Sequence, residues 1–357
     1  MKSIFILTSE GKNGKGGISR VSDYFCREVN EGEYYYPLES ITSTNGIPFP
    51  IWGFYFAYSL VRYFILAFRG KVALLHIHFA SRGDTYRNLF FFYISVMFCI
   101  PVVMHHHGSG FKDFYNGLGN NLKNSVGKML RLSKKVIILG ELWRDFFVNE
   151  VGVDEEKIVV LPNAIPDKGI GKKCLSTDCL KFVFMGKLCE EKGIPTLITA
   201  FSKVTECNWS LTLAGNGKIN EYKALAERLG VLDKVKFTGW VGEEEVDEIL
   251  KISDAFILPS RQEIHPIAML EAMAHKLAIL TTPVGIIPEF CVHEENCLLF
   301  PVDDAEALAR ELKEFIERPL HVRRLGDAAY KTFIEKFEIK AYKKKMLEVY
   351  DDVLGFI

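Results

Sequence analysis

The sequence predicts an α/β protein built from two parallel-sheet domains, and three observations support this prediction. Residues 253–282 place a polar loop and a helix between two short apolar runs, residues 255–258 and 278–280. Strand, loop, helix and strand in this order form the repeating unit of a parallel sheet. The chain also opens with a strand, a glycine-rich loop and a helix, and the same order restarts near Lys181. Its 357 residues are enough for two domains of ordinary size.

The first domain begins with an apolar strand over residues 2–8. Residues 9–17 then form a loop rich in Gly and Lys, and residues 18–29 carry apolar side chains at helical spacing. Glycines in such a loop allow the backbone to approach a ligand closely. The spacing differs from the dinucleotide-binding fingerprint G-x-G-x-x-G, so an NAD-dependent oxidoreductase is only a minor alternative.

The first domain continues with predicted strands over residues 72–79 and 101–106. Three consecutive histidines, His105, His106 and His107, stand at the end of the second strand. Neighbouring side chains on a strand point to opposite faces, so these three cannot all bind one ion, and no metal site is predicted. Their position after a strand suits contact with a ligand instead.

The second domain restarts with an apolar strand over residues 181–185, followed by a loop that carries Lys187 and Lys192. A helix is predicted to begin near Ile194. Cations beside the start of a helix suit a diphosphate, because the side-chain charge and the free N–H groups act on the same anion. The alternative is that both lysines are ordinary solvated surface residues.

Two carboxylates, Glu263 and Glu271, stand eight residues apart around Pro266, which can begin a helix because the first turn does not need its N–H. Both acids can face one pocket at the carboxyl edge of the sheet. The helix start favours an anion, and an acid further along the helix can accept hydrogen bonds from a sugar diol. On spacing alone, two solvated glutamates remain an equal alternative.

The surrounding sequence, P-S-R-Q-E followed by P-I-A-M-L-E-A-M-A, resembles the E-x7-E signature of retaining glycosyltransferases of family 4. G-K-L…K-G at 186–193, H-G at 107–108 and T-T-P-V-G-I-I-P at 281–288 resemble further motifs of that family. The resemblance implies the GT-B fold, in which two Rossmann-like domains flank an interdomain cleft. It implies an acceptor-side domain over residues 1–165, a nucleotide-sugar-binding domain over 166–336, and a C-terminal helix, 337–357, that crosses back to the first domain.

The resemblance also implies a reaction. A hexosyl group would pass, with retention of configuration, from a nucleoside diphosphate sugar to a saccharide or lipid-linked saccharide in the synthesis of capsule, O-antigen or exopolysaccharide. A UDP-sugar is the first candidate donor, and no metal or other cofactor is expected. Catalytic roles are implied for His107, Glu263 and Lys192. The implied donor-binding set is Gly16, Gly17, Lys187, Lys192, Glu263, Ile264 and Glu271, with Trp240 or Val241 near the nucleobase.

The sequence is also compatible with two other functions. A GT-B sugar-nucleotide epimerase would convert the donor without an acceptor. A non-catalytic nucleotide-binding protein would bind the donor and turn over nothing.

The composition limits which binding partners and which cellular compartment are expected. The net charge of −1 argues against a general nucleic-acid binder. Eight cysteines without a C-x-x-C pair predict reduced thiols in a cytoplasmic protein.

Residues 51–68 and 89–104 are two long apolar segments of the first domain. Arg62 lies in the middle of the first segment and would be costly in lipid, which favours buried or interfacial helices over membrane spans. Peripheral contact with the inner face of the plasma membrane stays open.

Overall fold

The computed structural model describes residues 2–9, 16–29, 34–44, 51–169, 179–206 and 208–356. Part of the predicted glycine-rich loop (residues 10–15), an early part of the predicted second domain (170–178), and Cys174 and Cys207 lie outside the described residues. The chain divides into two compact units. The N-terminal unit comprises Met1–Pro166 with Ile339–Ile357, and the C-terminal unit comprises Asp167–Glu338.

Within its described residues, the N-terminal unit holds a six-stranded parallel sheet in the order β2-β1-β3-β4-β5-β6. Its strands are β1 (Ser3–Thr8), β2 (Leu38–Thr42), β3 (Val72–Phe79), β4 (Val102–His106), β5 (Lys135–Ile138) and β6 (Ile158–Val160). The three central strands β1, β3 and β4 are buried along their whole length. This burial explains why their residues are mainly apolar, since helices cover both faces of a parallel sheet.

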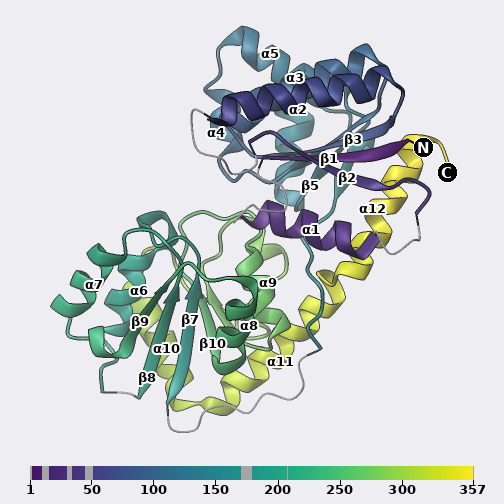
Figure 1. Ribbon diagram of the computed structural model, residues 1–357. Coiled ribbons are helices and arrows are strands. Elements are labelled where there is room, and N and C mark those ends of the chain that lie inside the picture. Colours follow the sequence, from purple (N-terminus) through teal and green to yellow (C-terminus); the bar gives the residue numbers. More distant parts are fainter. Residues whose placement is uncertain are drawn as a thin grey trace. The chain divides into compact units, whose positions relative to one another are not determined.

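Helices cover the two faces of this sheet: α2 and α3 lie on one, and α1 and α12 on the other (Figure 1). The helices are α1 (Gly17–Val29), α2 (Ile51–Phe68), α3 (Gly83–Met97), α4 (Phe111–Asn116), α5 (Asn120–Leu132) and α12 (Ile339–Leu354). Short turns of other helix types are η2 (Glu141–Trp143), η3 (Phe146–Glu150) and η4 (Glu155–Lys157). The C-terminal helix α12 packs on α1, where the Phe25 ring lies 5.7 Å from that of Tyr342 and 6.2 Å from that of Tyr350.

The apolar segment 89–104 is not a single element. Helix α3 ends at Met97, and β4 begins at Val102. Cys99 between them adopts a positive φ of 53°, and Pro101 lacks the N–H that a helix would need. The segment therefore consists of the end of a helix, a turn and a buried strand. It does not form one continuous apolar helix that could contact a membrane.

The C-terminal unit holds a second six-stranded parallel sheet within its described residues, in the order β12-β11-β10-β7-β8-β9. Its strands are β7 (Leu180–Met185), β8 (Trp209–Ala214), β9 (Val235–Gly239), β10 (Ala255–Leu258), β11 (Ala278–Thr281) and β12 (Leu298–Leu299). Its helices are α6 (Ile194–Phe201), α7 (Ile219–Arg228), α8 (Glu243–Ile252), α9 (Ile267–Ala274), α10 (Ala305–Glu317) and α11 (Pro319–Lys336), with 3₁₀ turns η5 (Glu190–Lys192), η6 (Leu232–Lys234) and η7 (Ile287–Glu289). Helix α6 packs on α10, and α9 packs on α11.

Each sheet contains a point where the strand order reverses. In the C-terminal unit the chain moves outward from β7 to β8 and β9 and then returns to place β10 on the other side of β7. In the N-terminal unit the same reversal separates β1 from β3. Open α/β sheets bind ligands outside the carboxyl ends of the two strands at such a point. A ligand site is therefore expected at the loops that follow β7 and β10 in one unit, and β1 and β3 in the other.

Candidate functional site

In the C-terminal unit, the loops after β7 and β10 bring two of the predicted catalytic residues into contact. The Lys192 ammonium donates a hydrogen bond of 2.5 Å to Oε1 of Glu263. The Ser260 hydroxyl donates to the same oxygen at 2.7 Å. The side chain of Glu263 is 10% exposed and that of Lys192 is 28% exposed, so the pair lies at the edge of the fold with one side open to solvent. A cation and a carboxylate thus stand together at the reversal point of the sheet.

Glycines allow these loops to lie so close together. Gly193, at the start of α6, adopts a φ of 69°, and a Cβ there would lie 1.9 Å from the carbonyl oxygen of Pro259. Gly285 has a φ of 58°, and its Cβ would lie 2.3 Å from the carbonyl oxygen of Glu263. No side chain fits at such distances, and the positive φ itself favours glycine. The loops after β7, β10 and β11 therefore pack against one another with backbone in direct contact with backbone. This contact fixes the position of Glu263.

Side chains that were not predicted as site residues hold the loop after β10. Arg261 donates from Nε to both carboxylate oxygens of Asp303, at 2.9 and 2.8 Å, and from a terminal nitrogen to Glu190 at 3.3 Å. The Thr282 hydroxyl donates to the carbonyl oxygen of Ser260 at 2.6 Å. Ser260 and Arg261 stand in the P-S-R-Q-E stretch of the sequence, but the sequence does not reveal their contacts with residues 22 to 71 positions away.

The loop leads directly into α9, which carries Glu271. Ile264 is buried, and its carbonyl oxygen accepts a hydrogen bond from the Ile286 amide at 3.1 Å. Glu271 is 5% exposed, so it is not one of the solvated glutamates that the spacing left open. A carboxylate at that depth is costly unless polar groups surround it, which fits a residue placed to contact a polar ligand.

His265 stands between these two acids and belongs to the core. Its ring lies 5.4 Å from that of Phe290 and 4.8 Å from that of Phe337. Burial lowers the pKa of His265 to about 3, so the ring is neutral at pH 7. It therefore adds packing to this loop and no positive charge.

The remaining predicted residues of this unit follow other strands at the same edge. Lys187 is exposed just after β7, next to Leu188, whose amide donates to the carbonyl oxygen of Asn216 after β8. Trp240 follows β9 with half of its surface exposed, and Val241 beside it is half-buried. Because all these strands are parallel, their carboxyl ends share one edge of the sheet, and the residues predicted to contact the diphosphate and the nucleobase follow strands at that edge.

In the N-terminal unit the predicted site residues follow β1 and β4. Gly16 and Gly17 are exposed at the start of α1. His107 follows β4, and its amide donates to the carbonyl oxygen of Phe79 at 2.8 Å. Its Nε2 lies 2.8 Å from Nδ1 of His78. A Cβ at Gly108 would lie 2.6 Å from the backbone of Ala80, so the H-G pair is held directly against the end of β3.

Two doubly wound units of this kind make up the GT-B fold of glycosyltransferases. A model for "Glycosyltransferase Family 4" matches residues 22–168, and a model for "Glycosyl transferases group 1" matches residues 171–332. The two matches follow one another and together take up most of the chain. The chain belongs to glycosyltransferase family 4, as the E-x7-E resemblance predicted.

Among the curated relatives, N-acetyl-alpha-D-glucosaminyl L-malate synthase of Bacillus anthracis is 31% identical over 166 residues, which are 46% of this chain and 43% of the relative. The lipopolysaccharide core biosynthesis glycosyltransferase LpsD of Rhizobium meliloti is 29% identical over 203 residues, 56% of this chain and 57% of the relative. The chain therefore spans about half the length of the curated relatives it matches.

Solved structures support the same fold. Anabaena HepE in complex with UDP and glucose has a TM-score of 0.77 at 16% identity, covering 98% of this chain and 99% of that one. Sucrose-phosphate synthase from Thermosynechococcus elongatus has a TM-score of 0.75 at 17% identity, covering both chains completely.

Proposed function

We propose that this chain is a retaining glycosyltransferase that moves a sugar from a nucleoside diphosphate sugar to a saccharide or lipid-linked saccharide in cell-surface polysaccharide synthesis. The observation that carries the proposal is the Lys192–Glu263–Ser260 contact at the reversal point between β7 and β10. Relatives named for lipopolysaccharide core and amylovoran synthesis support the product class, and a neighbour in complex with UDP supports a uridine diphosphate leaving group.

In the proposed reaction, the bond between the anomeric carbon and the diphosphate oxygen breaks, and a bond to the acceptor oxygen forms on the same face. The departing phosphate oxygen takes the acceptor proton. Lys187, Lys192 and the amides after Glu263 would stabilise the charge that builds up on the diphosphate, so no metal would be needed. Glu263 would bind hydroxyl groups of the donor sugar, and Glu271 would bind those of the ribose.

The remaining contacts would come from both units. In the N-terminal unit, the Gly16–Gly17 loop would lie against the diphosphate, and His107 would lie beside the transferred sugar. In the C-terminal unit, Trp240 or Val241 would border the nucleobase, where the exposed indole offers a flat apolar face for stacking.

The direct test incubates the purified chain with pooled nucleotide sugars and a membrane lipid extract and identifies the products by mass spectrometry. We expect one nucleotide sugar to be consumed, its nucleoside diphosphate to appear, and a lipid-linked product to gain the mass of one sugar. The Lys192→Ala variant is the negative control. Conversion of the donor into an isomer without an acceptor would indicate an epimerase. Binding of a nucleotide without any conversion of the pool would contradict the proposal.

We also propose that helix α2 contacts the membrane that carries the acceptor. Only Ser59, Tyr63 and Ala67 of this helix are buried. The opposite face exposes an apolar stripe of Phe54, Tyr58, Val61, Ile65 and Phe68. By length and composition alone, α2 could cross a membrane. Its Tyr63 is fully buried and hydrogen-bonded to Ser95 at 2.7 Å, which ties the helix to the unit and favours surface contact over crossing.

The double variant Phe54→Glu, Phe68→Glu is expected to lower binding to vesicles that contain anionic phospholipid by at least about 100-fold, because burying each phenylalanine side chain contributes about 1.5–3 kcal/mol. The two rings are 80% and 74% exposed, so folding should be unaffected. Cosedimentation with the vesicles measures the effect. Leu320→Glu is the matched control, because Leu320 is 81% exposed in the other unit. Equal binding of the double variant and the control would rule out α2 as the contact.

A further inference from the structure

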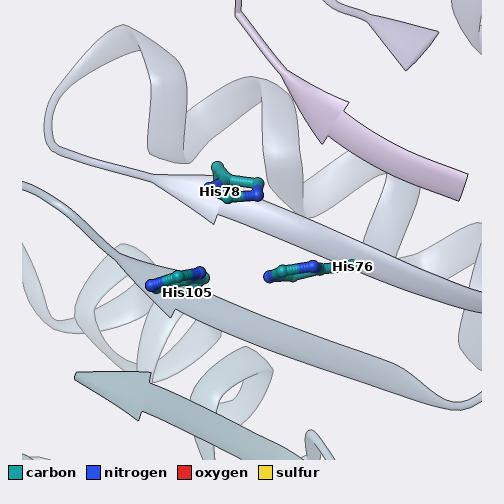
Figure 2. Close-up of side chains that lie close together, drawn as sticks. All are labelled: His76, His78 and His105. Carbon is teal, nitrogen blue, oxygen red and sulfur yellow. The ribbon is translucent and has the colours of Figure 1, made fainter. Parts of the chain in front are cut away.

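Three buried histidines lie together on one face of the N-terminal sheet, next to His107, and none of the three is among the residues assigned above to the donor. His76 and His78 are two positions apart on β3, and His105 lies on the neighbouring strand β4 (Figure 2). Side chains two positions apart on a strand share a face. His78 and His105 are also paired in register across the two parallel strands. His106 points the other way, and its Nε2 lies 2.9 Å from the carbonyl oxygen of Gly108.

Within the described part of the chain, some ring nitrogens of this cluster have a hydrogen-bond partner and others have none. Nδ1 of His76 lies 2.7 Å from the Tyr350 hydroxyl, and Nδ1 of His78 lies 2.8 Å from Nε2 of His107. Among the described residues, neither Nε2 of His76 nor either ring nitrogen of His105 has a hydrogen-bond partner. All three side chains are at most 3% exposed. A buried polar atom without a partner is costly, so three in one cluster require an explanation.

We propose that His76, His78 and His105 bind one transition-metal ion, with Zn²⁺ as the first candidate. Their ligand atoms all lie within 4.8 Å of one another. Zn–N bonds of about 2.0–2.1 Å allow two ligand atoms to lie at most about 4.2 Å apart, so small side-chain shifts would close the site around an ion. Imidazole nitrogens suit zinc, copper and nickel, whereas magnesium and calcium prefer oxygen.

The partners of the Nδ1 atoms strengthen this assignment. A histidine that binds a metal through one ring nitrogen usually donates from the other to a nearby acceptor, which fixes the ring and its tautomer. The Tyr350 oxygen stands in that place for His76, and Nε2 of His107 stands there for His78. Each ring then offers Nε2 to the ion. A water or hydroxide would complete a tetrahedral set and offset part of the charge.

The ion would have a structural role that does not depend on the proposed transfer reaction. Tyr350 belongs to α12 and is fully buried against β3 and α1. A metal bound by His76 would therefore stabilise the packing of the C-terminal helix α12 on the N-terminal sheet. It would also orient His107 through its contact with His78.

The test uses the full chain without an affinity tag, stripped with a chelator and dialysed. We expect one equivalent of zinc to be retained after gel filtration, as measured by elemental mass spectrometry. Titration with Co²⁺ should give the visible absorption bands of a tetrahedral site, and zinc should raise the melting temperature by about 5 °C. These readouts are independent of transfer activity, so a failed activity assay leaves them interpretable.

His105→Leu should abolish the stoichiometric zinc, the cobalt bands and the thermal shift. His106→Leu is the matched control, because His106 is equally buried in the same strand but faces the other way, and it should keep all three. His76→Gln serves as a second variant if His105→Leu does not fold. Zinc that washes off the wild-type chain, or that His105→Leu and His76→Gln retain at one equivalent, would overturn the proposal.

Discussion

Replacing Lys192 with alanine is expected to lower kcat/KM for sugar transfer by about 10²–10³-fold, because removal of one preorganised group that stabilises developing negative charge costs about that much. Lys192 stands at the start of α6, where its charge and the N–H groups of the first turn can act together on a diphosphate. Steady-state kinetics with the donor identified by the product assay measures the effect. Lys192→Arg should lose less activity, because it keeps the charge.

The control for Lys192 is Lys203→Ala. Lys203 is similarly exposed in the same unit and pairs with Glu306 at 2.7 Å, but it lies at the other end of α6 from the site. It should retain wild-type kinetics. Loss of Lys192 also removes the ion pair of Glu263, so melting temperatures must accompany the kinetics. A folded Lys192→Ala variant with full turnover would end the proposed role in diphosphate stabilisation.

The sequence predicts the elements that carry this site because they are short, buried and interrupted by Pro or Gly. Strand β10 and helix α9 occupy the predicted positions, since an apolar run, Pro266 and a run of helix-forming residues leave little choice. Strand β2 and helix α11 were not predicted. Strand β2 mixes apolar and polar residues at the sheet edge, and α11 is largely polar, so neither stands out by hydrophobic pattern.

Contacts that depend on the register between distant strands could not be predicted from the sequence alone. The histidines show this most clearly. In the sequence, His105 stands out as part of a run with His106 and His107, whereas the pairing of β3 with β4 brings it beside His76 and His78. The approach of Gly193 to Pro259 is similar: the glycine is visible in the sequence, but the carbonyl oxygen it faces lies 66 positions further along the chain.

Replacing Glu271 with glutamine is expected to weaken UDP binding by about 10–100-fold, since hydrogen bonds to a charged group contribute about 1.5–3 kcal/mol. Glutamine keeps the volume of this buried side chain, so it separates the loss of charge from the cavity that alanine would leave. Calorimetric titration measures the affinity. Glu248→Gln, an exposed glutamate on α8, is the control and should bind UDP like the wild type.

A ligand series can then assign the hydrogen bond of Glu271 to the ribose. Wild-type protein should bind the 2′-deoxy or the 3′-deoxy form of UDP more weakly than UDP. Glu271→Gln should discriminate between the deoxy form and UDP much less, because the two changes remove the same interaction and their free-energy costs do not add. If the free-energy costs of the variant and of the missing hydroxyl were additive, Glu271 would not bind the ribose hydroxyl groups. If UDP affinity were unchanged in Glu271→Gln, the whole assignment of the E-x7-E pair to the donor would fail, because a buried carboxylate at this edge of the sheet would then have no contact with the nucleoside.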